Sequence, residues 1–136
     1  MYEYKAVITN VVDGDTFDMD IDLGFHIHIH ERVRLLGVDT PEKFGEEKQL
    51  GLIVKKFAEK NFLNKKVIIY SEKENESADT DSFGRWLVYA ILDEDHDILE
   101  VDRNIEMIYC GLGINKNYYT YSEANVLKLA KEMIDL

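Results

Sequence analysis

The pattern of hydrophobic and polar positions along the chain predicts five short β-strands. The clearest strand lies over residues 17–23, where Phe17, Met19, Ile21 and Leu23 alternate with three aspartates. Strict alternation gives a strand one buried and one solvated face, because successive side chains point to opposite sides. The other strands are expected over residues 2–12, 25–38 (one long strand or a hairpin arm), 67–70 and 86–92. Short turns between the first three favour an antiparallel meander.

The spacing of apolar residues changes to a helical period over residues 46–63. The recurring positions are Leu50, Ile53, Val54, Phe57, Ala58 and Phe62. This pattern predicts one amphipathic helix, which ends at the Asn-Lys-Lys sequence over residues 64–66. Residues 99–108 also have a helical pattern, and Ser122 suits the N-cap of a last helix. We therefore expect a mainly β fold with helical cover (α+β): a five-stranded Greek-key barrel with three helices, for which the OB-fold is the natural candidate.

Length and composition fit one domain over residues 1–136. Hydrophobic residues make up 46% of the chain and charged residues 32%, which is ordinary for a globular protein. No apolar run has the length of a membrane span, and the N-terminal residues lack a signal-peptide pattern. We expect a cytoplasmic or host-cell intracellular protein without a membrane partner, unless a leader has been removed. The single cysteine, Cys110, excludes an internal disulfide and is interpreted as a small buried residue.

The net charge of −11 argues against a generic nucleic-acid binder. The chain has 27 acidic and 16 basic residues, whereas such binders usually present a basic face. Binding of nucleic acid would therefore require local positive charge, which a metal ion and a few suitably positioned arginines could supply.

The segment over residues 34–42, Arg-Leu-Leu-Gly-Val-Asp-Thr-Pro-Glu, is the most informative stretch of the sequence. Its leucines and valine favour a strand, which the Asp-Thr-Pro sequence should stop because proline has a fixed φ and no N–H. Asp39 and Glu42 are then held at the rim of a rigid element. Carboxylate oxygens beside the guanidinium of Arg34 suit a hard metal ion and a phosphate. Alternation would put Arg34 on one face with the apolar residues Leu36 and Val38. To reach a phosphate Arg34 must lie near the barrel rim, so we expect a bulge or twist at the end of this strand.

Each of the polar motifs is a weak signal alone. Asp-Gly-Asp-Thr over residues 13–16 is a common sequence for a hairpin turn. A local role of Asp39 in capping the backbone of its own turn would account for that residue. Phe-Gly-Arg over residues 83–85 can be a loop that leads into a strand, with Arg85 solvated. Together they place two turns, two arginines and a carboxylate beside strands of one barrel, which indicates a site.

With these motifs in this order, the chain resembles the staphylococcal nuclease (thermonuclease) family. The resemblance runs from about residue 6 to about residue 113. Members of that family are OB-fold enzymes that cleave DNA and RNA with calcium. The resemblance implies that Asp15 and Asp39 are carboxylate ligands of Ca²⁺ and that Thr40 is a ligand through its backbone carbonyl. Waters and a phosphate oxygen would complete the six to eight oxygen ligands that calcium prefers.

The resemblance also implies an endo/exonuclease with three catalytic residues. Arg34 and Arg85 would clamp the phosphate, and Glu42 would orient or deprotonate the attacking water. The bond to the 5′ oxygen would break and leave a 3′-phosphate, while the cations stabilise the charge that builds up on the phosphoryl oxygens.

The expected nucleotide contacts depart from the family pattern. The lysine–tyrosine pair before the glycine at residue 84 is replaced by Ser-Phe, so Phe83 can stack on a base but offers no hydroxyl. Tyr118 and Tyr119 are further substrate-binding candidates, with core packing as the alternative. We expect a monomer whose partners are DNA and RNA, preferably single-stranded or denatured. The alternative is a non-catalytic OB-fold module that binds nucleic acid or protein.

Three histidines alternate with three apolar residues over residues 25–30. The histidines are His26, His28 and His30, and the apolar residues are Phe25, Ile27 and Ile29. A zinc site is one interpretation, because neutral imidazole is a good ligand. The pattern favours the other interpretation, in which the imidazoles lie on a polar outer face and the apolar residues are buried.

Overall fold

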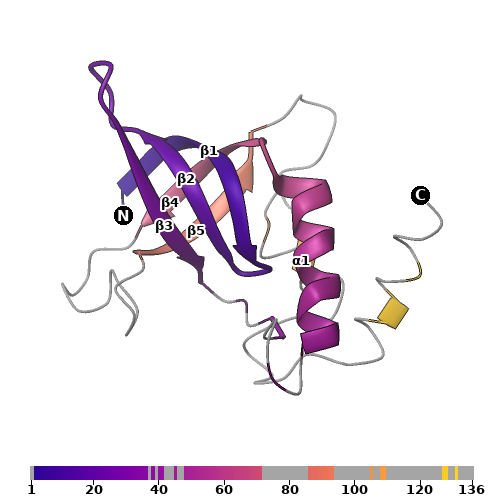
Figure 1. Ribbon diagram of the computed structural model, residues 1–136. Coiled ribbons are helices and arrows are strands. Elements are labelled where there is room, and N and C mark those ends of the chain that lie inside the picture. Colours follow the sequence, from indigo (N-terminus) through magenta and orange to yellow (C-terminus); the bar gives the residue numbers. More distant parts are fainter. Residues whose placement is uncertain are drawn as a thin grey trace.

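The described part of the chain forms five strands and one long helix (Figure 1). The computed structural model describes residues 2–36, 38, 40–41, 45, 48–71, 86–93, 105, 108–109, 127–128 and 131. In chain order the elements are β1 (Tyr2–Asp13), β2 (Thr16–Asp22), β3 (His28–Leu35), α1 (Lys48–Phe62), β4 (Lys66–Ser71) and β5 (Trp86–Leu92). All five predicted strands and the first predicted helix are therefore confirmed.

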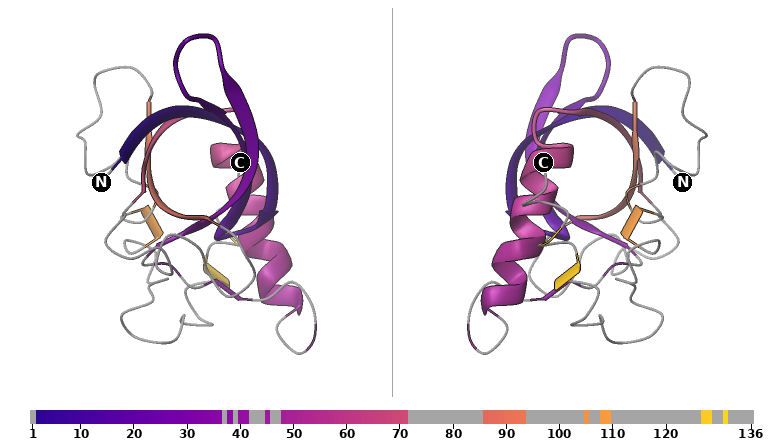
Figure 2. Two further views of the ribbon diagram at one scale, coloured as in Figure 1. Left: turned by 90° about the vertical axis from the view of Figure 1, so that its left-hand side faces the viewer. Right: turned by 90° about the vertical axis from the view of Figure 1, so that its right-hand side faces the viewer.

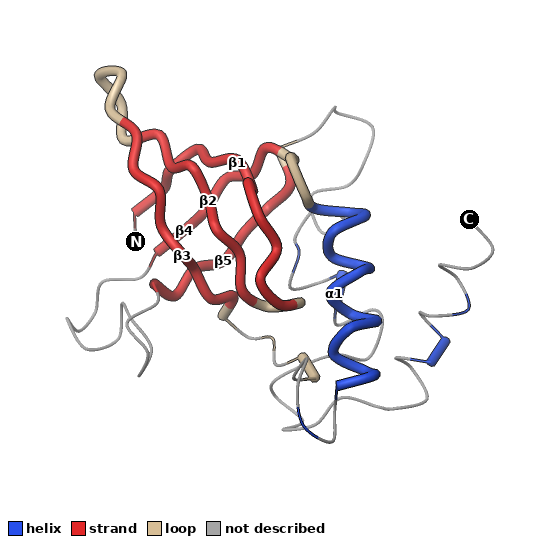
Figure 3. The backbone as a smooth tube through the Cα atoms, viewed as in Figure 1, coloured by secondary structure: helices blue, strands red, loops and turns tan. Residues whose placement is uncertain are grey.

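The strands close into a barrel with the order β1-β2-β3-β5-β4 (Figures 1 and 3). The β3–β5 pair is parallel and the other four pairs are antiparallel. This closed five-stranded arrangement is consistent with the predicted OB-like fold. The helices predicted over residues 99–108 and after Ser122 fall largely outside the described residues. Seven further residues discussed above lie entirely outside them: Asp39, Glu42, Phe83, Arg85, Cys110, Tyr118 and Tyr119.

The core fills the barrel and extends to α1, which lies against one end of it (Figure 2). On β2 the side chains of Phe17, Met19 and Ile21 are buried and the intervening aspartates are not, as the alternation predicts. The rings of Phe17 and Phe62 meet edge to face, with centroids 6.1 Å apart. Aromatic pairs of this geometry contribute about 0.5–1.5 kcal/mol beyond area burial, so they fix α1 on the barrel.

The connection from α1 to β4 joins the helix to β1. Asn64 adopts a left-handed conformation with φ 64°, and its N–H donates to the Ile8 carbonyl at 2.8 Å. The N–H of Ile8 donates in turn to the carbonyl of Lys65 at 3.0 Å. Asparagine tolerates this conformation better than most residues, which confirms the predicted helix end.

The third strand is shorter than predicted. It begins at His28 and ends at Leu35, because the chain leaves the sheet after the Leu36 N–H donates to the Val88 carbonyl at 2.9 Å. The predicted face shared by Arg34, Leu36 and Val38 is therefore wrong. The β2–β3 register runs without a shift from residue 16 to residue 22, so no bulge lies at Arg34, and the irregularities are in β1.

The predicted burial of Phe25, Ile27 and Ile29 is wrong. Their exposed fractions are 96%, 54% and 37%, because the β2–β3 hairpin projects beyond the barrel and leaves no core beneath its tip (Figure 1).

The described residues contain no group of three histidine, cysteine or acidic side chains suited to a metal ion, and His28 pairs with Asp20 at 3.0 Å. No helix in the described ranges is long and apolar enough to cross a membrane.

Candidate functional site

The turn between β1 and β2 places the carboxylate of Asp15 in a buried position at the end of β3. Asp13 and Thr16 are the last cross-strand pair, so Gly14 and Asp15 form the two-residue turn that the sequence predicts. Asp15 is 7% exposed, and its carbonyl accepts the N–H of Leu35 at 2.9 Å. The turn is therefore attached to β3 through the backbone.

Gly14 is required by close packing and not by its dihedral angle. Its φ is not positive, in contrast to that of Gly24. A Cβ atom at Gly14 would lie 2.4 Å from Cγ1 of Val54 on α1 and 3.1 Å from Cγ2 of Thr40. The buried hydroxyl of Tyr109 donates to the carbonyl of Gly14. Helix α1 and Tyr109 thus hold this turn from two sides.

The carboxylate of Asp15 accepts contacts from three segments. Oδ1 accepts the hydroxyl of Thr16 at 3.0 Å. Oδ2 accepts the backbone N–H of Thr40 at 3.1 Å and lies 3.3 Å from Nη2 of Arg34. The structure therefore brings together three of the residues predicted for the site: Asp15, Arg34 and Thr40.

The guanidinium of Arg34 is held in a fixed orientation. Its Nη1 donates to the carbonyls of Leu35 at 2.8 Å and Val38 at 2.6 Å, while Nη2 faces Asp15. The side chains of Arg34 and Asp15 are only 15% and 10% exposed, so their charges interact more strongly than a surface pair does. A planar fork that is already oriented suits a phosphate group.

The donor atoms around Asp15 fit a hard cation such as calcium. The Asp15 carboxylate and the backbone of Thr40 offer oxygen ligands, which are the type that calcium prefers. Within the described part of the chain, the hydroxyl of Thr40 is buried and has no hydrogen-bond partner. A buried polar atom of this kind is costly unless it is satisfied, so its presence beside a carboxylate supports a polar ligand there.

The other predicted site residues lie outside the described residues, but their neighbours in the chain are placed. Asp39 lies in sequence between Val38 and Thr40, which are both buried. Arg85 directly precedes β5, whose first residue Trp86 is in register with Val33. The described neighbours of these two residues, Thr40 and Trp86, therefore lie beside Asp15 and beside β3.

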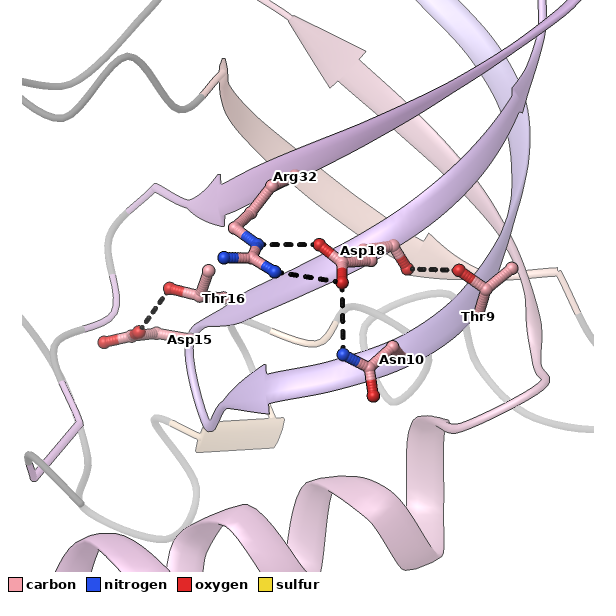
Figure 4. A network of polar contacts seen from close by, with 6 residues as sticks. All are labelled: Thr9, Asn10, Asp15, Thr16, Asp18 and Arg32. Atoms are coloured by element: carbon pink, nitrogen blue, oxygen red, sulfur yellow. Dashed lines mark hydrogen bonds and ion pairs between the residues drawn. The ribbon is translucent and has the colours of Figure 1, made fainter.

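A second polar network on the outer face of β2 and β3 was not predicted (Figure 4). Nε and Nη2 of Arg32 donate to the two carboxylate oxygens of Asp18 at 2.8 and 3.3 Å. Asn10 donates to the same carboxylate at 3.1 Å. The hydrogen bond from Arg32 holds the pKa of Asp18 below its ordinary value. The two residues are directly opposite in the β2–β3 register, so knowledge of that register would have found the pair.

Tyr109 was also missed, because its only signal in the sequence is an aromatic residue directly after the predicted helix over residues 99–108. The structure buries it completely against Phe57 and Phe62, beneath the site turn. Burial, and secondarily the charge of Asp15, raises the pKa of Tyr109 well above its usual value. The neutral phenol is therefore the form that the folded protein favours.

Comparison with known proteins identifies relatives of this chain. The family model described as "Staphylococcal nuclease homologue" matches residues 32–133. A thermonuclease of Staphylococcus intermedius is 33% identical over 92 residues, which cover 65% of this chain and 49% of that protein. An uncharacterized protein of Methanocaldococcus jannaschii is 29% identical over 121 residues, which cover 75% of this chain and 55% of that protein. The chain spans about half the length of the curated relatives it matches.

Replacing Gly14 with alanine should destabilise the fold by about 1–3 kcal/mol, because the new methyl group overpacks against Val54. The Val54→Ala change removes Cγ1 and should relieve part of this cost. Urea unfolding of both single variants and the double variant would then give a favourable coupling energy of about 0.5–3 kcal/mol. Strictly additive effects would show that the contact between the turn and α1 does not restrict residue 14.

The Tyr109→Phe variant should be less stable than the wild type at neutral pH by about 1–3 kcal/mol, because the carbonyl of Gly14 loses a buried donor. The raised pKa of Tyr109 also predicts an alkaline effect. The unfolded tyrosine ionises near pH 10 while the folded one stays neutral, so the wild type loses stability above about pH 10.

Urea unfolding between pH 7 and pH 11 would measure this loss, with Tyr2→Phe, a change at an exposed tyrosine, as the matched control. The stability of Tyr109→Phe should fall less steeply above pH 10 than that of either the wild type or the control. Equal slopes in all three proteins would contradict the assignment.

Proposed function

Because the chain belongs to the staphylococcal nuclease family, we propose that it is a calcium-dependent phosphodiesterase that hydrolyses DNA and RNA. The observation that supports this most strongly is the group formed by Asp15, Arg34 and Thr40. In it a buried carboxylate and a nearly buried guanidinium share one site, and the guanidinium is already oriented by two carbonyls. A site of this composition suits a phosphodiester together with a divalent cation.

In the proposed mechanism, Asp15, Asp39 and the carbonyl of Thr40 would hold the ion. When it is bound, calcium supplies positive charge to the phosphoryl oxygens. Arg34 binds the same phosphate through its planar fork, and its contacts with Leu35 and Val38 keep the fork from rotating during the reaction. Electrostatic groups that are fixed in advance need little reorganisation in the transition state.

The residues outside the described ranges complete the proposal. Arg85 acts as the second phosphate-binding fork, and Glu42 orients or deprotonates the water that attacks phosphorus. The bond to the 5′ oxygen breaks and a 3′-phosphate remains. Phe83, Tyr118 and Tyr119 contact the nucleotide, which favours single-stranded or denatured substrates because their bases are accessible for stacking.

The acidic character of the chain is compatible with this proposal. Asp18, Asp20 and Asp22 lie on the outer side of β2, and Asp18 is neutralised by Arg32. The site needs positive charge only around the phosphate, where Arg34 and the bound ion supply it. We expect weak, calcium-dependent binding of nucleic acid and not the strong general attraction of a basic protein.

A comparison of two arginines on β3 tests the proposal. Arg34→Lys should lower the calcium-dependent release of acid-soluble nucleotides from denatured DNA by at least about 10²-fold, because an ammonium group cannot replace the oriented fork. Arg32→Lys is the matched control on the same strand face, and its activity should stay within about twofold of wild type, since its exposed pair with Asp18 contributes little. Circular dichroism would confirm that both variants are folded.

Chelation of calcium and two further variants distinguish the enzyme from the alternative, a non-catalytic OB-fold module that binds nucleic acid or protein. Release in the presence of calcium should stop with a chelator, and Arg85→Ala and Glu42→Gln should abolish it in folded protein. Binding of denatured DNA without any release by the wild type would instead support the binding module. Equal activity of the Arg32→Lys and Arg34→Lys variants would refute the role of Arg34.

A further inference from the structure

Residues from all five strands line a pocket of about 300 Å³ in the barrel, which Figure 2 shows end-on. Asp15, Arg34 and Thr40 do not line this pocket, so it is separate from the proposed nuclease site. A volume of this size is at the lower end of the range for ligand pockets and suits a small molecule. Six aliphatic residues form much of the wall: Ile21, Leu23, Ile29, Val33, Ile69 and Val88.

Glu31 is the one charged residue among the described residues that line the pocket. Ile29 and Val33 flank it on the same face of β3, and Met19 lies opposite it on β2. Its side chain is half-buried, and within the described ranges its carboxylate takes part in no hydrogen bond or ion pair. A carboxylate among apolar side chains is costly unless a donor or a cation meets it, so this position favours a positively charged ligand.

Two aromatic side chains line the same pocket as Glu31. Trp86 is the first residue of β5, and Tyr4 lies on β1. The indole of Trp86 is 43% exposed, so a ligand in the pocket can reach it. The faces of aromatic rings attract cations, and tryptophan does so most strongly. An acidic group and two aromatic rings in an apolar pocket therefore favour an organic cation over a neutral or anionic ligand.

The charge of the chain favours a cation as well. The net charge is −11, and the sequence between the two lining residues Ser71 and Trp86 contains five acidic and two basic residues. An excess of one sign of charge raises the local concentration of small ions of the opposite sign. The phosphate of a nucleic acid would meet Glu31 unfavourably in this pocket, so the expected ligand differs from the proposed nuclease substrate.

We propose that this pocket binds a small organic cation with a methylated ammonium head group. A metal ion does not fit, because a hard cation needs several oxygen ligands and Glu31 is the single carboxylate among the described lining residues. A primary ammonium carries three N–H donors, each of which needs an acceptor when it is buried. A methylated ammonium instead presents methyl groups, which pack against aliphatic and aromatic walls without hydrogen bonds.

In this proposal each part of the ligand has its own contact. The positive head group lies by the carboxylate of Glu31 and by the rings of Trp86 and Tyr4, and the methyl groups meet the aliphatic wall. The charge and the methyl groups therefore both contribute to affinity, and a ligand that lacks either one should bind more weakly. This site does not depend on the proposed nuclease function, because the two sites share no residue.

Tryptophan fluorescence and calorimetry at constant ionic strength test this proposal with three probes. Trp86 is the single tryptophan of the chain, so its emission reports on the pocket directly. Choline should change the emission saturably, with a dissociation constant on the order of 1 mM for so small a ligand. Ethanolamine has the charge without the methyl groups, and 3,3-dimethyl-1-butanol has the shape of choline without the charge. Each of these two should bind at least about fivefold more weakly than choline.

Two matched variants isolate the role of Glu31. Glu31→Gln keeps the shape of the side chain and should lower the affinity for choline at least about tenfold, while the affinity for the neutral alcohol stays within about twofold. Glu3→Gln removes an exposed charge from β1 outside the pocket and should bind choline like the wild type.

Three results would overturn the proposal. The first is the absence of both heat and a change in emission at about thirty times the expected dissociation constant, where the site would be nearly full. The second is equal affinity of the wild type for choline and the neutral alcohol, which would indicate a purely apolar pocket. The third is an unchanged affinity for choline in folded Glu31→Gln.

Discussion

The buried carboxylate of Asp15 connects the parts of this structure that must stay together. It accepts contacts from Thr16 at the start of β2, from Arg34 near the end of β3 and from the backbone of Thr40 beyond that strand. Removing a carboxylate from water is costly unless its oxygens are satisfied, so these three segments are held to one geometry. Gly14 and Tyr109 extend the arrangement to the interior, because they fix the same turn against α1 and the aromatic core.

The two ends of the barrel have different chemistry. Polar side chains with fixed orientations gather at the turn beside α1, whereas the pocket within the barrel is lined mainly by apolar side chains, with Glu31 as the one charged residue among the described residues that line it. Strand β3 contributes to both regions, because Ile29, Glu31 and Val33 line the pocket while Arg34 belongs to the site.

Much of the fold could be predicted from the sequence, because alternation and helical spacing report burial directly. The alternating residues of β2 and the apolar face of α1 lie where their patterns predict. The same rule failed at the β2–β3 hairpin, since alternation cannot show where the barrel beneath a strand ends. The candidate site residues were predicted from the order of the motifs and the family resemblance, and the structure brings three of them together. The close packing of Gly14 against Val54 and the burial of Tyr109 depend on tertiary packing that no local pattern encodes.

The most direct test of the central claim is a calorimetric titration of calcium into the wild type and into the Asp15→Asn variant. The asparagine keeps an acceptor for the N–H of Thr40 but removes the negative charge, so the fold can persist while a calcium ligand is lost. One calcium ion should bind per wild-type chain, and the affinity should be at least about tenfold lower in the variant, a difference of about 1.4 kcal/mol. Equal affinities in two folded proteins, or no binding by the wild type, would contradict the assignment of this carboxylate to a metal site.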